Sequence, residues 1–226
     1  YGGQLLKEYK IKDLNTKPLN KEEMKLWIQN NKLNILVDGS HPYAAEVTKN
    51  AIECSKELNI KYVRYERLGA LEQISCDNII RVKDYDEAIE YIKTLNGNVL
   101  NTTGGNNVTK FINIDFNYRV IHRILPSPSV LSKIVDAGIK IIDIIAIQGP
   151  ITYDLEKAFI KQFDVKAILT KDSGVQGGVL DKFKAAKDSN IKIIVIEKTK
   201  FDYELEFHDE ESLVDFLVVH ENFTQR

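Results

Sequence analysis

The chain has 226 residues, 43% of them hydrophobic, so it can bury a sizeable core as one large α/β unit or as two small lobes. Its 31 Lys and Arg nearly balance its 33 Asp and Glu, which gives a net charge of −2 and leaves no basic surplus for nucleic acid. The longest apolar stretch, residues 139–147, is too short to cross a bilayer. We therefore expect neither nucleic acid nor a membrane as a partner.

The two cysteines, Cys54 and Cys76, lack metal-ligand spacing and are typical of reduced packing thiols. They favour a cytoplasmic location, and we expect no metal site. The sequence opens at Tyr1 without a methionine, so a leader could precede it.

Short β-rich apolar runs alternate with amphipathic helical stretches, a pattern typical of parallel sheets with crossover helices. The predicted strands span residues 34–38, 61–65, 98–102, 118–124, 141–147, 167–170 and 192–196. The predicted helices span residues 44–58, 85–95, 129–135, 153–163, 179–188 and 210–219. This alternation predicts the α/β fold class.

The strongest turn signal in the middle of the chain is Asn96-Gly97-Asn98, which separates two runs of βα units of similar size. It predicts an N-terminal lobe of residues 1–96 and a C-terminal lobe of residues 97–226.

Four loops that follow predicted strands are unusually polar or glycine-rich, and ligands of open parallel sheets bind at such strand ends. They span residues 38–42, 102–107, 148–150 and 170–178. Glycines before a helix let the backbone approach an anion closely, which makes phosphate the first ligand to consider. An ordinary turn is the alternative for Gly104-Gly105, whereas the last loop is more polar than a connection needs. Neither loop matches GxxxxGK[ST] or GxGxxG, which disfavours kinases and ATPases.

Three further side chains at strand ends suit catalysis or anion binding. His41 precedes Pro42 at a predicted helix start, where an imidazole could donate a proton, contact an anion, or merely cap and pack. Arg64 and Arg67 flank Glu66 and could clamp carboxylates or phosphates, with a surface ion pair as the alternative.

Together, these loops resemble the precorrin-6A reductase and cobalt-precorrin-6A reductase family over nearly the whole chain. The matching blocks are DGSHPYA at 38–44 (DATHPFA in the family), RYER at 64–67 (RxxR), TG at 103–104, RILP at 123–126 (RVLP), QGP at 148–150 and TKDSG at 170–174 (TKxSGG). Glu156 and Lys182 fall at further family positions, whereas residues 68–70 and 198–199 depart from the family pattern. The family's first βα unit, upstream of Gly2-Gly3, is missing from this sequence, so we expect the chain either to bind the coenzyme poorly or to depend on residues outside the given sequence.

The resemblance implies two Rossmann-like lobes with a cleft between them, and hydride transfer from NADPH to a contracted tetrapyrrole on the route to cobalamin. It makes His41 and Lys171 the candidate catalytic residues, as proton donors. The implied coenzyme-binding residues are Thr103, Gly104, Gly105, Ser173, Gly174, Gly177 and Gly178. The implied substrate-binding residues are Ser40, Arg64, Arg67, Gln148, Gly149 and Asp172. Cations and helix N-termini among these residues suit the acetate and propionate carboxylates of the macrocycle.

Two other functions stay open. One is a nucleotide-dependent transferase that uses the loop at 170–178 as its phosphate site, which a metal requirement would favour. The other is a non-catalytic carrier of a tetrapyrrole or nucleotide, which binding without turnover would favour. The sequence leaves open the oligomeric state, with a monomer as the default, and whether the substrate contains cobalt.

Overall fold

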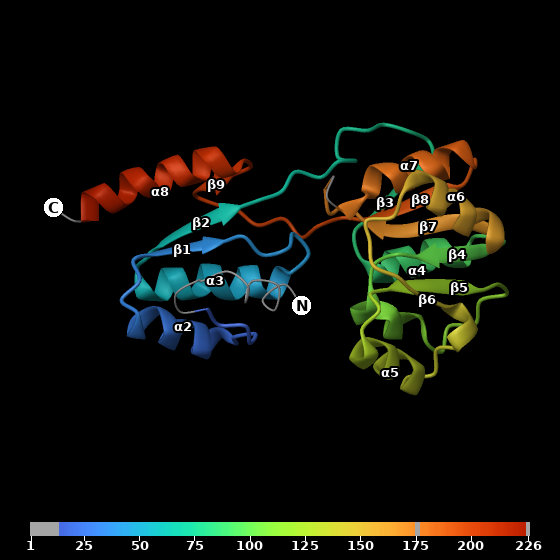
Figure 1. Cartoon of the computed structure of the whole chain (residues 1–226), viewed down its shortest axis with the longest axis horizontal. Helices are drawn as coiled ribbons and strands as arrows, with labels where there is room; N and C mark the ends of the chain where they lie inside the picture. The colour runs from blue at the N-terminus through green and yellow to red at the C-terminus, as the bar shows by residue number, and fades with distance from the viewer. Residues whose placement is uncertain (1–13, 175–176, 225–226) are drawn as a thin grey trace. The chain divides into compact units, whose positions relative to one another are not determined.

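The computed structural model describes residues 14–174 and 177–224, so Gly2 and Gly3 lie outside the described residues. The chain forms two compact units (Figure 1). The first combines Tyr1–Glu66 with Phe201–Arg226, and the second is the continuous segment Arg67–Lys200. The backbone therefore passes between the units twice.

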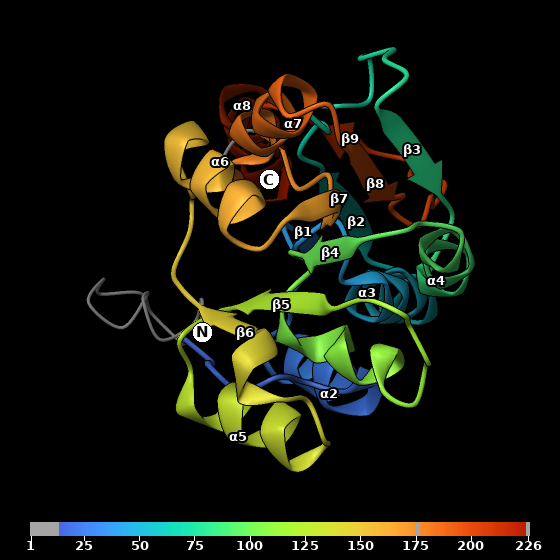
Figure 2. The same ribbon diagram turned by 90° about the vertical axis from the view of Figure 1, so that its right-hand side faces the viewer.

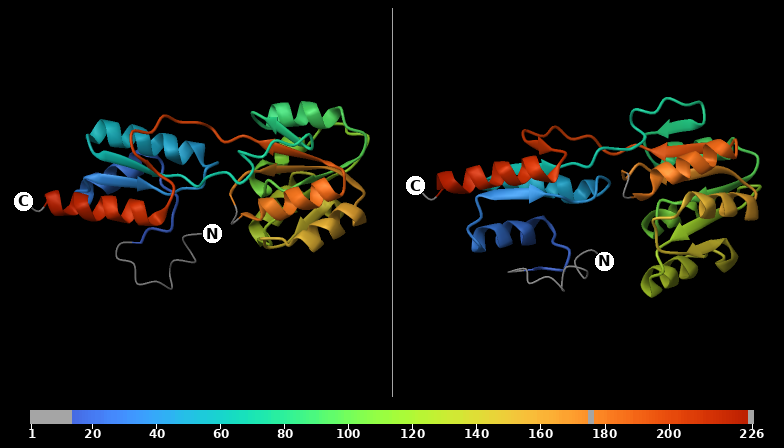
Figure 3. Two further views of the ribbon diagram at one scale, coloured as in Figure 1. Left: turned by 90° about the horizontal axis from the view of Figure 1, so that it is seen from above. Right: turned by 45° about the horizontal axis from the view of Figure 1, so that its top comes forward.

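The first unit holds a short parallel sheet in the order β1-β2-β9, with β2 in the centre. Its elements are α2 (Lys21–Asn30), β1 (Ile35–Asp38), α3 (Ala45–Leu58), β2 (Lys61–Tyr65), β9 (Glu206–Phe207) and α8 (Glu210–Thr224). Helix α3 packs against β1 and β2, and α2 packs against α3. Helices α3 and α8 lie on opposite sides of the sheet (Figures 1 and 3).

Helix α2 is fixed by its N-terminal cap and by ion pairs to α3. The Asn20 side chain accepts a hydrogen bond from the backbone N–H of Glu23, and the Glu23 carboxylate accepts one from the N–H of Asn20. Lys21 Nζ lies 2.6 Å from Glu53 Oε2 and 2.8 Å from Glu57 Oε1. These contacts hold a largely polar helix against α3, where only Ile28 of α2 is buried.

The second unit contains a six-stranded, wholly parallel sheet in the order β3-β8-β7-β4-β5-β6. Its strands are β3 (Ile79–Val82), β4 (Asn98–Asn101), β5 (Val120–Ile124), β6 (Ile144–Ala146), β7 (Val165–Lys171) and β8 (Lys192–Ile196). Its helices are α4 (Tyr85–Lys93), η2 (Gly105–Phe111), α5 (Pro128–Asp136), η3 (Ile141–Asp143), α6 (Tyr153–Gln162) and α7 (Val179–Asp188).

Right-handed crossovers put the helices of this unit on both faces of the sheet. The chain moves in one direction across the sheet from β3 through β4 and β5 to β6, and then returns through β7 to β8. The connections of the first run therefore cover one face, and α6 and α7 cover the other. Figure 2 shows α6 and α7 on the side of the strands opposite to α4.

The core of the second unit forms where the central strands are covered on both faces. Ile168, Leu169, Ile193 and Ile194 are fully buried, as expected for adjacent parallel strands with helices on each side. A smaller cluster of Val108, Ile124 and Ile134 joins η2 and α5 to the sheet.

The predicted α/β class with mainly parallel sheets is confirmed, whereas the expected division of the chain is wrong. Residue 96 lies between α4 and β4, inside the second unit. The reason is that β3, which precedes this turn, pairs with β8 in the same sheet as β4. The cleft between the lobes stays a prediction.

Several elements differ from the expected ones. Helix α2, the 3₁₀ helix η2 and the short strands β3 and β9 were not predicted. The strand predicted at 141–147 is instead η3 followed by the three-residue β6, and Ile141 and Ile142 are more than 70% exposed. Within residues 14–174 and 177–224, no helix combines the length and apolar character needed to span a bilayer.

Candidate functional site

The carboxyl edge of the six-stranded sheet gathers most of the sequence-predicted site residues. All six strands are parallel, so the loops after β4 and β7 leave the sheet at the same edge. The strand order reverses between these two neighbours: the chain goes from β4 to β5 on one side, and from β7 to β8 on the opposite side. Such a switch point is where open α/β sheets bind ligands.

The loop after β4 is held from below by a buried asparagine. Asn101 is fully buried, and its Oδ1 accepts hydrogen bonds from the backbone N–H of Thr103 at 3.0 Å and from Thr103 Oγ1 at 2.8 Å. Gly104 follows with φ +87°, and open space lies where a Cβ would stand. A ligand can therefore approach this backbone closely.

His122, in the neighbouring strand β5, supports Asn101. The amide nitrogen Nδ2 of Asn101 lies 3.1 Å from His122 Nδ1, and because an amide N–H donates, that ring nitrogen accepts. The imidazole is 2% exposed, and burial lowers its pKa to about 4. His122 is thus neutral at physiological pH and acts as a structural acceptor.

Gly105, at the start of η2, has a packing role. A Cβ at this position would lie 2.3 Å from Cγ1 of Val130 in α5, so only glycine lets η2 approach α5 this closely. Gly105 supports the loop geometry, in addition to the coenzyme-binding role expected for it.

The loop after β7 is anchored by Asp172. Its Oδ1 accepts hydrogen bonds from the N–H of Ala70 at 2.9 Å and of Gly174 at 3.4 Å, and its Oδ2 accepts one from the N–H of Leu71 at 2.7 Å. Asp172 is only 7% exposed. Its carboxylate therefore ties the β7 loop to the segment before β3, which is a structural use of a residue expected to bind substrate.

The remaining residues of this loop line the same edge. The ammonium of Lys171 lies 5.7 Å from the ring centroid of Tyr85, and that of Lys110 lies 5.6 Å from it. Ser173 sits so close to Gly177 that a Cβ on the glycine would lie 2.1 Å from Ser173 Oγ. Two residues of the predicted loop, Val175 and Gln176, lie outside the described residues.

The loop after β6 meets the loop after β7. Gln148 and Gly149 are exposed, and Gly149 is joined to Pro150 by a cis peptide bond. A Cβ on Gly178, which has φ +66°, would lie 3.2 Å from Pro150 Cβ. The structure thus brings the predicted QGP block against Gly178, at the start of α7.

A buried polar cluster lies beneath these loops. Arg123 Nη1 of β5 donates to Glu156 Oε2 of α6 at 2.8 Å, and Glu156 is fully buried. Lys182 of α7 is 5% exposed, and its Nζ donates to Thr170 Oγ1 of β7 at 2.9 Å. Burial lowers the pKa of Lys182 to about 8, and the charge of Arg123 acts in the same direction.

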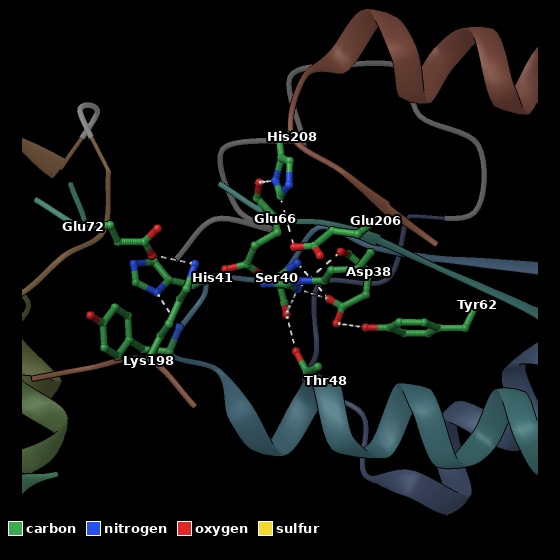
Figure 4. A network of polar contacts seen from close by, with 12 residues as sticks. Asp38, Ser40, His41, Thr48, Tyr62, Glu66, Glu72, Lys198, Glu206 and His208 are labelled. Carbon is green, nitrogen blue, oxygen red and sulfur yellow. Dashed lines mark hydrogen bonds and ion pairs between the residues drawn. The ribbon is translucent and has the colours of Figure 1, made fainter. Parts of the chain in front are cut away.

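In the first unit, the carboxyl ends of β1 and β2 carry a buried charge network (Figure 4). Arg64 Nη1 lies 3.0 Å from Asp38 Oδ1 and 3.2 Å from Ser40 Oγ, and its Nε lies 2.6 Å from Glu66 Oε2. Arg64 is 1% exposed, Glu66 3% and Asp38 6%. The ion pair foreseen as an alternative for Arg64 therefore exists, but it is buried instead of lying at the surface.

Hydrogen bonds and nearby charges keep Asp38 and Arg64 ionised although both are buried. Burial opposes ionisation of Asp38, but hydrogen bonds involving Ser40, Thr48 and Tyr62 outweigh it and lower its pKa. Burial likewise acts to lower the pKa of Arg64, but the hydrogen bond to Glu66 and the charge of Asp38 raise it.

The two other predicted residues of this region differ in exposure. His41 is exposed, and its Nδ1 accepts a hydrogen bond from the backbone N–H of Tyr43 at 3.2 Å. Arg67, the first residue of the second unit, is partly exposed and makes no hydrogen bond or ion pair with the described part of the chain. Arg67 is therefore better suited to meet a carboxylate than Arg64 is.

Several residues of these networks were missed from the sequence. Asn101 could have been found, because it is a polar residue that directly follows the apolar pair Val99-Leu100, just before the TG block. Asp38 likewise ends an apolar run, residues 35–37. Tyr203, whose ring centroid lies 5.9 Å from Arg64 Cζ, gives no such signal because it reaches the network from the far end of the chain.

Comparisons with known proteins agree with this arrangement. The sequence profile of the family described as Precorrin-6x reductase CbiJ/CobK matches residues 1–218. A cobalt-precorrin-6A reductase of Methanocaldococcus jannaschii is 40% identical over 218 residues, which cover 96% of this chain and 84% of that protein. A cobalt-precorrin-6A reductase of Priestia megaterium is 36% identical over 203 residues, covering 88% of this chain and 79% of that protein.

A solved structure supports the fold independently. The structure titled CobK precorrin-6A reductase superimposes with a TM-score of 0.71 at 16% sequence identity, covering 89% of this chain and 79% of that one. The profile match over residues 1–218 and the two relatives above 30% identity show the family of this chain. This chain belongs to the precorrin-6x reductase family of oxidoreductases.

Proposed function

We propose that this chain uses NADPH to reduce a ring double bond of cobalt-precorrin-6A during cobalamin biosynthesis. The observation that carries the proposal is the pair of glycine loops, after β4 and after β7, on the two sides of the switch point of the six-stranded sheet. The cobalt form is favoured because the relatives at 40% and 36% identity bear that name.

The residues at the switch point fit a dinucleotide. Gly104 leaves open space over its backbone, and the loop leads directly into η2, so N–H groups there can meet a phosphate. On the other side of the switch point, Ser173 and Gly174 follow β7. We assign the coenzyme phosphates to these two loops.

The end of β5 favours NADPH over NADH. In a sheet of this topology, the strand after the glycine loop ends beside the adenosine ribose, and an acidic residue there binds the 2′-hydroxyl of NAD. Residues 120–135 contain no Asp or Glu, and Ser127 and Ser129 follow the strand instead. A 2′-phosphate would therefore meet no carboxylate in this segment.

When bound, NADPH supplies the hydride, and the protein must position the substrate and deliver a proton. We propose Lys171 and His41 as the candidate proton donors. Arg67 and Gln148 are assigned to the carboxylates of the macrocycle, because Gln148 is exposed and Arg67 partly so. Gly149, which is exposed next to Gln148, is assigned to the same substrate-binding surface.

Two residues are reassigned within the proposal. Arg64 is 1% exposed and holds Ser40, so we propose that it orients the end of β1 and acts on substrate through Ser40. Asp172 has its oxygens occupied by backbone N–H groups, so we propose that it shapes the β7 loop.

The test is to follow nicotinamide absorbance with the full chain, NADPH, and either cobalt-precorrin-6A or precorrin-6A. We expect oxidation of NADPH that depends on the tetrapyrrole, is faster with the cobalt form, and needs no Mg²⁺. Tight binding of both ligands without oxidation would contradict the proposal and indicate a carrier. A strict need for Mg²⁺ and a phosphorylated product would indicate a transferase instead.

A further inference from the structure

Lys182 is a buried cation that the fold alone does not require. It lies in α7, between Val179, which is fully buried, and the fully buried Ala185 and Ala186. An apolar side chain of similar length would pack in such a place without the cost of taking an ammonium out of water. The charge therefore calls for an explanation in its contacts.

Those contacts join the helix to the end of β7. Lys182 Nζ donates to Thr170 Oγ1 at 2.9 Å, and Thr170 is 1% exposed. Thr170 is paired with Val195 of β8 and immediately precedes Lys171, so this hydrogen bond fixes the point where the loop leaves the sheet. Because α7 begins at Val179, the bond spans the base of the whole loop from β7 to α7.

The surrounding charges act on the protonation of Lys182. Glu156 and Asp172 favour the ammonium, whereas Arg123 disfavours it. Glu156 is itself held by Arg123 at 2.8 Å, so the acid cannot easily move to pair with Lys182 alone. Charged side chains of β5, α6 and α7 thus act on one another electrostatically, and Lys182 joins this group to the end of β7 by its hydrogen bond to Thr170.

We propose that Lys182 is a positioning residue of the reductase, which acts through Thr170 to hold Ser173 and Gly174, just after β7, in the conformation that binds the coenzyme. This inference rests on the proposed function, in which Ser173 and Gly174 of the loop after β7 contact NADPH. Lys182 is buried below the loop and acts without touching either ligand.

The experiment compares Lys182→Met, Thr170→Val and the double variant with the unchanged full chain. Each single variant is expected to raise the KM for NADPH by about tenfold, with a smaller change in kcat, since a charge-assisted hydrogen bond that orders the binding loop is lost. The double variant is expected to be no worse than either single one, because both remove the same bond. Lys187→Met, at an exposed position of the same helix, should leave both constants unchanged.

Thermal unfolding separates positioning from simple stabilisation. Removing a buried charge should leave the Tm of Lys182→Met unchanged or raised, while NADPH binding weakens. A lower Tm with an unchanged KM would overturn the inference, and so would unchanged kinetics in both single variants.

The inference and the proposed function can fail separately. NADPH affinity is also measured directly by nicotinamide fluorescence titration of each variant. If the unchanged chain binds NADPH but turns over neither tetrapyrrole, the proposed function fails, and weaker NADPH binding by Lys182→Met still supports the positioning role. If the unchanged chain does not bind NADPH, both are overturned.

Discussion

The neutral state of His122 links the folding of the second unit to acid. Its pKa is about 4 in the folded chain against 6.5 for an ordinary histidine, because burial disfavours the charged ring. Between these values the unfolded chain binds one more proton, so stability falls as the pH drops from 6.5 towards 4 and is unaffected above 6.5. We expect a loss of roughly 3 kcal/mol of unfolding free energy over this window.

Urea unfolding as a function of pH measures this loss. His122→Gln, which keeps an acceptor for Asn101 but does not titrate, should lose about 3 kcal/mol less than the unchanged chain over the same window. Parallel pH profiles for the two proteins would show that the ring is not held neutral.

Ser127 offers a test of coenzyme choice at a single side chain. Ser127→Asp places a carboxylate at the end of β5, and because Asp is as good an N-cap residue as Ser, α5 should remain intact. The new charge should repel a 2′-phosphate and raise the KM for NADPH by about tenfold or more. NADH serves as the internal control, and an equal rise in both KM values would place the ribose elsewhere.

At the scale of elements, the contact between η2 and α5 depends on a missing side chain. Gly105→Ala would push a methyl group to within 2.3 Å of Val130 Cγ1, and Val has little freedom to rotate away. We expect destabilisation of about 1–3 kcal/mol, measured by urea unfolding.

A double-mutant cycle checks the cause of this effect. In a Val130→Ala background, where the clashing atom is absent, Gly105→Ala should cost less than about 1 kcal/mol. Additive effects of the two substitutions would mean that the glycine is required for another reason.

The elements that the sequence predicted well are those with long apolar patterns. Residues 192–196 form a continuous apolar run after one lysine, and they are the buried strand β8. Strand β3 has only four residues, one of them an arginine, so its pattern is too short to recognise. Helix α2 could have been found from the capping box of Asn20 and Glu23.

Among the site residues, those in local motifs could be predicted from the sequence, and those that support them from another strand could not. The glycine loops follow strands and are readable as local motifs, which is why Thr103, Gly104 and Ser173 could be proposed from the sequence. The support beneath them could not, because the bond between Asn101 and His122 joins two strands, and no local motif links residues 21 positions apart. A sequence pattern shows which residues are polar, but pairing across a sheet decides which of them meet.

At the scale of the whole molecule, the turn at residues 96–98 misled the division into lobes because turn strength is a local property. The partner of β3 is β8, more than a hundred residues later, and β9 likewise pairs with β2 from the far end of the chain. Such pairings are set by tertiary structure and leave no mark at the turn.

The continuous second unit should fold by itself. A fragment of residues 67–200 contains the complete six-stranded sheet and its core, so we expect cooperative thermal unfolding followed by circular dichroism. If the coenzyme loops are correctly assigned, the fragment should also bind NADPH, with a Kd within about tenfold of the full chain. A fragment of residues 1–66 is the matched comparison, and it should not unfold cooperatively because it lacks β9.

The chain leaves the first unit after Glu66 and returns to it at Phe201. We therefore expect the two units to be completed at different times during synthesis on a ribosome. Strands β1 and β2 emerge early and can pair with each other, but the edge strand β9 is added only near the end of synthesis, whereas the second unit can close before translation ends. A ribosome that stops before residue 201 would release a chain with a finished six-stranded sheet and an unpaired edge on β2. We expect such a product to be cut by proteases faster than the full chain, because β2 keeps unpaired backbone groups at its edge.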